Sequence, residues 1–422
     1  MPNVQLCLIF LLQIAIIVAA CRLVGWCARK FLGQPQVVGE MIAGVILGPS
    51  FFGALFPIEQ ALLFPAETKP ILFAISQFGV GLYMFLVGLG FDREEFGNNA
   101  RSAAFVSIGG IIAPFAAAAL LVPWMLGIGG LFVPGLSQEQ ATLFLGAAIA
   151  ITAFPMLARI IHERGFSGTP LGTLSLSAGA IGDAGAWCVV ALVLAGLGNS
   201  PMIAVKTIGG GLAFAILMIG FAPKWLAPLN QLMRGQNASK CGIAIALILF
   251  AISAYTMDVI GIHAVFGGFL LGTAMPRGSF GKSLRRRLEP LTVVILLPLF
   301  FTFSGLNTQL LVVNNASLIA VAIAIISSSI LAKGGACYLA ARLSGQDHPT
   351  AMGIGALMNA RGLMELIIIN IGLQRGIIGP ALFAILVTMA IVTTLMASPL
   401  FELVYGRAAR MRQPIMATTN IP

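Results

Sequence analysis

Five charged side chains stand inside long apolar stretches of the sequence, namely Glu40, Asp183, Lys333, Arg361 and Glu365. A charge at the centre of a lipid bilayer costs at least about 2.5–3.5 kcal/mol, so each of these residues is expected to have a specific role. A carboxylate held away from water binds a proton more readily than one in water, and it can also bind a small monovalent cation. The chemistry that these residues offer is therefore competition between two cations for one buried site.

Asp183 is the strongest candidate for this role. It lies near the middle of an apolar stretch, among the small residues between Gly179 and Gly185, which leave room for water or an ion beside the carboxylate. We expect Thr152 and unwound backbone to supply further oxygen ligands, so that Asp183 becomes a site for Na⁺ or K⁺ as well as for H⁺. A purely structural ion pair is the alternative interpretation.

Lys333 is the expected charge partner of Asp183. At a helical rise of about 1.5 Å per residue, Lys333 lies roughly 14 Å from Arg342 and Asp183 roughly 20 Å from Pro170, both on the same side of the membrane. The difference is within the reach of a lysine side chain, and pairing lowers the cost of burying both charges. The alternative is a lysine that extends to the membrane surface.

The elements that hold these residues must be helices that cross a membrane. The chain has 422 residues, of which 59% are hydrophobic and 9% charged, whereas a soluble protein carries about 25% charged residues. Apolar stretches of about 20 residues, enough to cross a bilayer, recur along the sequence. We expect an all-α multi-pass membrane protein with about thirteen spans, at roughly 4–28, 36–56, 70–90, 101–124, 141–162, 171–197, 201–222, 240–256, 259–275, 289–308, 316–341, 350–373 and 378–405.

The net charge of +10 is a topology signal. With the N-terminus outside, the cytoplasmic loops, helix ends and tail contain eighteen basic residues, and the outer side contains only Lys69 and Arg375. This asymmetry follows the positive-inside rule, so no nucleic-acid partner is expected. Residues 406–422 form a short basic cytoplasmic tail, and no loop is long enough for a soluble regulatory domain. The cysteines and histidines lack metal-ligand spacing, and no cofactor is expected.

Two spans are expected to be interrupted. The fifth contains Pro155, which removes a backbone hydrogen bond from the helix, and the twelfth contains Asn359, Arg361 and Glu365. Arg361 and Glu365 are four residues apart, and we expect them to neutralise the partial charges of half-helix ends rather than to contact a substrate. A simple proline kink is the alternative for the fifth span.

The positions of the two breaks indicate an internal repeat. Interrupted segments in corresponding places of two halves point to a transporter binding site. Residues 1–197 and 240–405 are the expected inverted repeats, with 201–222 as the linker helix, and the breaks then fall in equivalent spans. The whole range 1–405 is thus expected to form one transmembrane domain.

Two further titratable residues receive a structural interpretation. Glu40 opens the second span, where packing at a junction between helices is favoured over ion binding. His263 lies near the outer start of the ninth span, and a satisfied structural histidine is favoured over a pH sensor.

Several motifs together resemble a known family. The chain is similar to the monovalent cation:proton antiporter superfamily in its sodium/hydrogen exchanger domain, and specifically to the branch with plant cation/proton exchangers and bacterial homologues. The matching stretches span nearly the whole chain and are residues 34–50, 152–159, 179–187, 261–272, 297–305 and 358–366.

The resemblance implies a secondary antiporter that exchanges Na⁺ or K⁺ for H⁺ by alternating access, as in pH homeostasis. It implies a homodimer in a bacterial inner membrane, with a dimerisation domain and a core domain that contains two crossed, unwound helices. In this comparison Asp183 carries the ion and the proton, Lys333 is its partner and Thr152 lies near the crossing. The supporting residues of the crossing region are then Phe154, Pro155, Ser177, Asn359, Arg361 and Glu365.

One departure from the family pattern leaves alternatives open. The family usually has Asn-Asp or Asp-Asp at this site, whereas this chain has Gly182-Asp183. One or two protons per cation are both compatible with Lys333 being retained. A proton-coupled transporter of an organic anion, which Lys333 and Arg361 would bind, and a transport-inactive sensor are the other hypotheses. An intramembrane aspartyl protease is disfavoured because it needs a second aspartate in mid-membrane, so the chain is not expected to be an enzyme.

Overall fold

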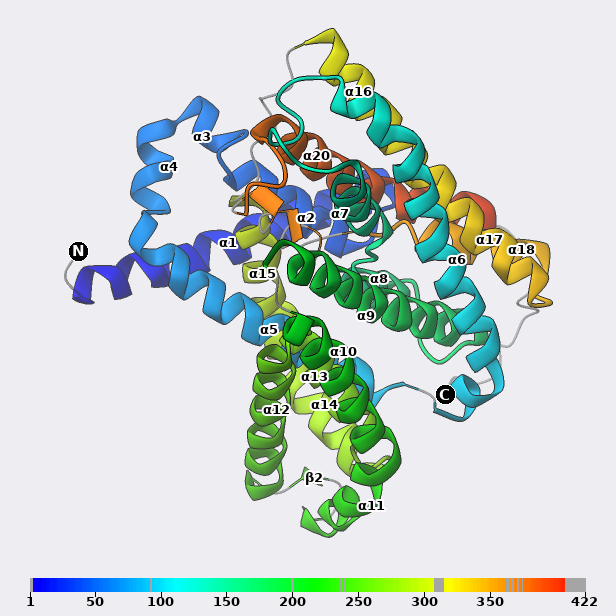
Figure 1. The fold of residues 1–422 in the computed structure, drawn as a ribbon. Helices are drawn as coiled ribbons and strands as arrows, with labels where there is room; N and C mark the ends of the chain where they lie inside the picture. The colour runs from blue at the N-terminus through cyan, green and yellow to red at the C-terminus, as the bar shows by residue number, and fades with distance from the viewer. Residues whose placement is uncertain are drawn as a thin grey trace. The chain divides into compact units, whose positions relative to one another are not determined.

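The chain is helical nearly throughout in a computed structural model that describes residues 3–91, 93–198, 201–234, 237–238, 240–306, 315–361, 365, 368–369, 372–373 and 375–406 (Figure 1). Its only strands in these ranges are the two-residue β1 (Met233–Arg234) and β2 (Asn237–Ala238), which pair antiparallel. All of the basic tail expected at 406–422 except Gly406 lies outside the described residues.

The helices follow one another in an order that matches the expected spans closely. The first half contains α1 (Asn3–Leu32), α2 (Gln36–Leu47), α3 (Phe52–Leu55), α4 (Pro57–Leu63), η1 (Ala66–Thr68), α5 (Lys69–Leu89), α6 (Arg93–Leu126), α7 (Gln138–Ala150), α8 (Phe154–Glu163) and α9 (Pro170–Gly198). The rest contains α10 (Pro201–Ile216), η2 (Leu217–Phe221), α11 (Ala222–Leu226), η3 (Ala227–Leu232), α12 (Lys240–Ile260), α13 (Ala264–Ala274), α14 (Ser279–Leu291), η4 (Thr292–Leu296), α15 (Leu297–Leu306), α16 (Ala316–Ser328), η5 (Ser329–Gly334), α17 (Gly335–Leu343), α18 (His348–Leu357), α20 (Pro380–Phe401) and η6 (Glu402–Gly406).

The protein is a multi-pass membrane protein. Within the described residues, nine helical stretches are long and apolar enough to cross a bilayer, and α13 is a shorter apolar helix. Large hydrophobic side chains such as Leu120, Ile252 and Leu331 are exposed along these helices, as is expected of a surface that faces lipid. The number of thirteen crossing helices remains a prediction.

Some expected loops contain helices, and the longest of these helices is α14. The span boundaries predict a connection at residues 276–288, but α14 begins at Ser279 and continues through η4 into α15. Phe280 and Leu284 lie four residues apart and are both fully buried, whereas Arg286 and Arg287 fall on other faces of the helix. This segment is amphipathic with a helical period, a pattern that a search for uniformly apolar spans does not detect.

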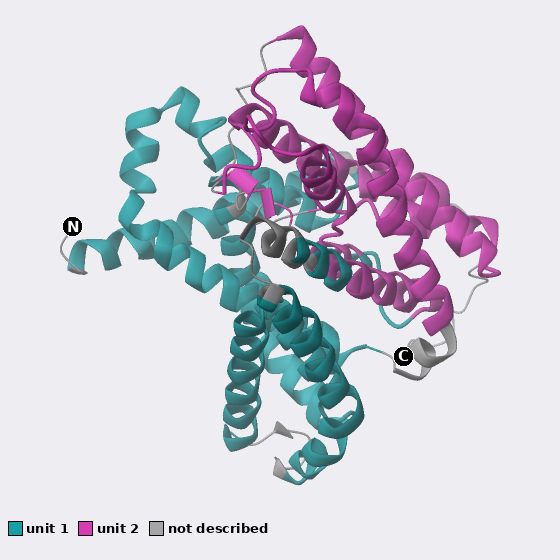
Figure 2. Cartoon of the chain, in the orientation of Figure 1, with its two compact units in different colours: residues 1–95, 161–168, 184–314 teal, residues 96–160, 169–183, 315–422 magenta. Residues whose placement is uncertain are grey.

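The described chain divides into two compact units, which Figure 2 shows in different colours. Unit 1 comprises residues 1–95, 161–168 and 184–314, and unit 2 comprises residues 96–160, 169–183 and 315–422. Helices α8 and α9 each contribute to both units. Every charged candidate residue except Glu40 lies in unit 2.

Unit 1 is built on closely packed helices, among which α5 packs against α13 and α2 packs against both α1 and α15. Glycines allow this approach: a Cβ atom on Gly88 would lie 2.9 Å from the Cα atom of Gly272, so the backbones of α5 and α13 meet there. Small residues at such crossings are typical of membrane helices. A buried cluster around Phe85, Phe250 and Phe280 fills the space between α5, α12 and α14.

Unit 2 packs α16 and α18 against α20, and α17 against α18. Helix α6 lies against α17, where the Cys337 sulfur is 3.6 Å from the carbonyl oxygen of Val106. A Cβ atom on Gly109 would lie 3.4 Å from the carbonyl oxygen of Ala336, so the two helices are in close contact. In η5, which precedes α17, Ser329 and Lys333 are buried whereas Leu331 is exposed, so one face of η5 points into the unit.

Candidate ion-binding site

The two predicted breaks exist, and they meet. Helix α7 ends at Ala150 and α8 begins at Phe154, while α18 ends at Leu357 and residues 358–361 are not helical. The amide of Ala153 donates a hydrogen bond of 3.0 Å to the carbonyl oxygen of Ala360. The non-helical backbone of one segment therefore bonds to that of the other, which agrees with the rule that such backbone at membrane depth is buried in protein or lines a water-filled cavity.

Pro155 explains why α8 restarts where it does. It is the second residue of α8, and proline is tolerated in the first turn of a helix because the amide hydrogens there have no partner within the helix. The same residue disfavours a continuous helix from α7 into α8, since its ring would clash with the preceding turn. Phe154, fully buried beside it, anchors the start of α8.

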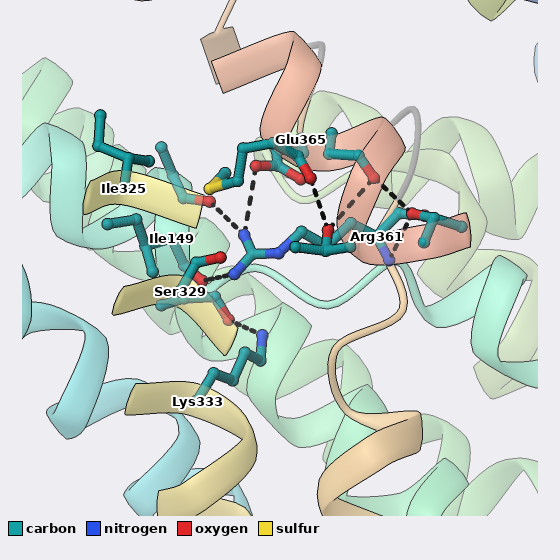
Figure 3. A network of polar contacts seen from close by, with 12 residues as sticks. Ile149, Ile325, Ser329, Lys333, Arg361 and Glu365 are labelled. Carbon is teal, nitrogen blue, oxygen red and sulfur yellow. Dashed lines mark hydrogen bonds and ion pairs between the residues drawn. The ribbon is translucent and has the colours of Figure 1, made fainter. Parts of the chain in front are cut away.

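The carboxyl end of α7 is held by two cationic side chains (Figure 3). Arg361 donates to the carbonyl oxygens of Ala148 at 3.1 Å and Ile149 at 2.6 Å, and the ammonium of Lys333 donates to that of Ala150. These carbonyls have no partner within the helix, and they form the negative end of its dipole. Two buried positive charges thus stabilise a helix end that stops inside the protein.

Arg361 is also part of a fully buried ion pair. Its Nη1 atom lies 3.2 Å from Oε1 of Glu365, and both side chains have 0% exposure. The Thr394 hydroxyl on α20 donates to the Arg361 carbonyl oxygen at 2.7 Å, and the Arg361 amide lies 3.1 Å from the same hydroxyl oxygen. The backbone and the guanidinium are therefore both fixed, as expected for a residue that supports the crossing.

Asp183 is fully buried on α9. Four residues earlier, a Cβ atom on Gly179 would lie 2.7 Å from Leu157 and 3.6 Å from Phe154, so α9 packs directly on the start of α8. Positions i and i+4 share a helix face, which brings Asp183 to the break between α7 and α8. The Lys333 side chain and the Phe154 amide act on its carboxylate electrostatically.

The expected pairing of Asp183 with Lys333 is electrostatic rather than a direct contact. The hydrogen bond of Lys333 goes to Ala150, and the structure records no ion pair within 4 Å between Lys333 and Asp183, both of which are described residues. Helical rise along the sequence puts Asp183 and Lys333 at similar depths in the membrane. It does not reveal that the carbonyl oxygen of Ala150 competes with Asp183 for the Lys333 ammonium.

Several oxygens near the crossing are buried and form no hydrogen bond of standard geometry with a described residue. They are both carboxylate oxygens of Asp183, the hydroxyl of Thr152 and the side-chain carbonyl of Asn359. Among described residues, these oxygens are available to bind something else. One carboxylate with neutral oxygens is a donor set that suits a hard cation, and buried polar groups in proteins are rarely left unsatisfied.

The remaining predicted residues serve other contacts. Ser177 donates to the carbonyl oxygen of Thr173, one turn earlier on α9, at 2.6 Å. Glu40 and His263 belong to unit 1: Glu40 accepts a hydrogen bond from Gln36 at 3.0 Å, and His263 accepts one from the Val265 amide at the start of α13. These contacts agree with the structural interpretation of both residues.

Thr394 and Ser107 were not predicted from the sequence. Thr394 bonds to the Arg361 backbone, and Ser107 is a buried hydroxyl on α6 with no hydrogen bond among the described residues. Both are hydroxyl residues in apolar spans, where serine and threonine commonly bond to their own helix. Nothing in the sequence distinguishes them from such residues.

Known proteins resemble this chain over nearly its full length. The model of the family described as sodium/hydrogen exchanger, transmembrane, matches residues 6–404. The Na(+)/H(+) antiporter NhaS4 of Synechocystis sp. is 36% identical over 411 residues, which are 95% of this chain and 98% of that protein. Cation/H(+) antiporter 17 of Arabidopsis thaliana is 32% identical over 407 residues, 94% of this chain but only 48% of the plant protein.

A solved structure shows the same fold. The sodium proton antiporter MjNhaP1 from Methanocaldococcus jannaschii at pH 8 superposes with a TM-score of 0.57, at 14% sequence identity, over 94% of this chain and 97% of that one. At this identity the likeness concerns the fold alone. The family model covers almost the whole sequence and the cyanobacterial relative matches from end to end, and the chain therefore belongs to the transmembrane sodium/hydrogen exchanger family of transporters.

Proposed function

We propose that this protein is a secondary antiporter that exchanges a monovalent cation, Na⁺ or K⁺, for H⁺ across a membrane. The observation that carries the proposal is the buried carboxylate of Asp183, which accepts no hydrogen bond of standard geometry from a described residue. It stands beside two helix ends that meet inside unit 2. The names of the relatives, which speak of Na⁺, cations and H⁺, agree with this function.

The charges around the crossing suit a site that binds a proton and a metal cation in turn. The amide of Phe154 belongs to the amino end of α8, whose dipole favours negative charge, so the ionised form of Asp183 is stabilised once the proton leaves. Lys333 adds a positive charge beside Asp183, and an arriving cation must overcome its repulsion. Such a site holds one proton or one metal ion, and neither permanently. Thr152 is the proposed neutral ligand for the metal ion.

An organic anion is the less favoured substrate. Such a substrate would need a free cationic side chain in the binding site. Arg361 is hydrogen-bonded to two carbonyl oxygens and to Glu365, and Lys333 is hydrogen-bonded to Ala150. Binding an anion at either residue would take hydrogen bonds away from the carbonyl oxygens at the carboxyl end of α7.

The division into units supports the proposed inverted repeats, 1–197 and 240–405. Unit 2 takes residues 96–160 and 169–183 from the first repeat and residues from 315 onward from the second. These residues contain the fourth, fifth and first part of the sixth predicted span and the eleventh to thirteenth spans, which are equivalent because the two repeats of six spans are offset by seven. We propose that unit 2 is the domain that carries the ion and that unit 1 contains the contacts of a homodimer.

The orientation and location are proposals of the same kind. The distribution of basic residues favours an N-terminus outside and a C-terminus in the cytoplasm, and we propose a bacterial inner membrane. No cofactor is required for exchange, because the gradients of the two ions supply the free energy.

The decisive experiment uses proteoliposomes with an acidic interior and a pH-sensitive dye. Addition of Na⁺ or K⁺ outside should dissipate the pH gradient for the natural protein and not for Asp183→Asn, which keeps the shape of the side chain but cannot ionise. Asp347→Asn is the matched control, because Asp347 precedes α18 outside the crossing. Equal activity of natural protein and Asp183→Asn would refute the proposal.

A further inference from the structure

Ser107 is a buried hydroxyl whose surroundings leave it unsatisfied. Its side chain is 1% exposed, and its oxygen has no hydrogen bond with any described residue. A serine within a helix usually bonds to a carbonyl oxygen one turn earlier, as Ser177 does in the same unit. Burying a hydroxyl without a partner costs free energy, so a bound ion or water molecule is the expected partner of Ser107.

The position of Ser107 places it beside the candidate site. It follows Val106, whose carbonyl oxygen contacts Cys337 on α17, one helical turn beyond Lys333. On its other side, the Ser107 oxygen would lie 3.3 Å from a Cβ atom on Gly182, the residue that precedes Asp183. Helix α6 thus carries this hydroxyl against α9 at the residue that precedes Asp183.

The glycine at position 182 is what allows this approach. A Cβ atom on Gly182 would be in tight contact with the Ser107 oxygen, and apart from its two chain neighbours and the nearby backbone of α9, no other described atom would lie within 4 Å of it. Asp183 is the next residue of α9, about 100° further round the helix, so its side chain leaves α9 on the adjoining side. A cation bound to Asp183 on the side of Ser107 is therefore a candidate partner for the unsatisfied hydroxyl.

We propose that the Ser107 hydroxyl is a ligand of the transported monovalent cation, which it binds together with Asp183. A neutral oxygen at this place replaces part of the hydration shell of the cation without adding a second negative charge. Ser107 therefore influences how tightly the cation is held and which cation is preferred, while the proton still binds to Asp183 alone. This inference rests on the proposed exchange function.

The test moves the hydroxyl from one helix to the other. Ser107→Ala should raise the KM for the cation about tenfold, the usual effect of losing one contact to a charged ligand, and leave Vmax unchanged. The double variant Ser107→Ala with Gly182→Ser puts a hydroxyl back at this contact from α9, and it should recover most of the affinity. Ser107→Ala with Gly182→Ala adds a methyl group at this contact without a hydroxyl and should not recover it.

The readouts separate this inference from the proposed function. KM and Vmax are measured with Na⁺, K⁺ and Li⁺ in the same proteoliposomes, and cation-dependent thermal stabilisation of the purified protein gives a second measure of binding. An unchanged KM in Ser107→Ala, or equal values in the two double variants, would overturn the role of Ser107 even if Asp183→Asn abolishes exchange. Exchange that persists in Asp183→Asn would instead refute the proposed function. If Ser107→Ala alone does not fold, the comparison of the two double variants decides.

Discussion

Replacing Arg361 by methionine should destabilise the protein measurably. The side chain is fully buried, pairs with Glu365 at 3.2 Å and donates to the carbonyl oxygens of Ala148 and Ile149. Methionine fills a similar volume but makes none of these contacts. Removing one partner of a buried ion pair costs about 3–5 kcal/mol, because the other charge stays buried and uncompensated.

The expected change in melting temperature follows from this free energy. For a chain of 422 residues, an unfolding entropy of about 2.1 cal/mol/K per residue converts the loss into a decrease in Tm of at least about 3 °C. Membrane proteins keep part of their helical structure when they unfold, so their entropy change is smaller and the decrease is larger. Tm is measured on the protein in detergent at one scan rate, since unfolding is often irreversible.

A double variant tests whether the ion pair is the cause. Arg361→Met with Glu365→Gln removes the charge that Arg361→Met leaves behind, and it should regain at least half of the lost Tm, because buried pairs are strongly coupled. The lost contacts to α7 explain the remainder. If Arg361→Met melts like the natural protein, or if the double variant loses the sum of the two single effects, the reasoning about this buried network is wrong.

Three further outcomes follow from the site. Lys333→Met should lower Tm by an amount that corresponds to about 1.5–3 kcal/mol, and Lys333→Gln, which keeps a donor for Ala150, should lower it less; equal Tm values would show that this hydrogen bond does not matter. Thr152→Ala should raise the KM for the cation about tenfold, whereas Thr152→Ser, which keeps the hydroxyl, should not, and equal effects would remove the hydroxyl from the site. At pH values low enough for protons to occupy Asp183, each further decrease of one pH unit should raise the KM for the cation about tenfold and leave Vmax unchanged, because one proton and one cation compete for one carboxylate. A KM that does not vary with pH would exclude this competition.

Much of the fold could be predicted because the membrane constrains the sequence so strongly. Spans such as α1, α12 and α16 must be apolar over about 20 residues, and this pattern is visible without any tertiary information. The break in the twelfth span was predictable for the same reason, because the charges around Arg361 are costly in a helix that faces lipid. Pro155 indicated the other break less strictly, since Pro114 and Pro123 lie inside the continuous helix α6. The amphipathic α14 was missed because it carries charge along one face and does not need to be apolar all round.

The candidate site was predictable in its members but not in its contacts. Asp183, Lys333 and Arg361 stand out because burying a charge is costly. Which acceptor each donor finds depends on the carbonyl oxygens within its reach. The last carbonyl oxygens of α7 are free to accept these hydrogen bonds only because the helix ends at Ala150. Ser107 does not stand out in the sequence. It becomes notable because its buried hydroxyl faces Gly182 on another helix, which has no side chain to bond to it.

The sequence by itself determined that this protein lies in a membrane, that its helices break at two places and that a few charged residues are the candidates for its site, because the cost of placing a charge in lipid acts on each residue individually. Only the tertiary structure decided which groups meet: that Ala153 and Ala360 join the two breaks, and that Lys333 and Arg361 bind carbonyl oxygens of α7 rather than a carboxylate on α9. Hydrogen bonds and close packing act over a few ångströms between segments that are hundreds of residues apart, and the chain order does not encode those distances directly.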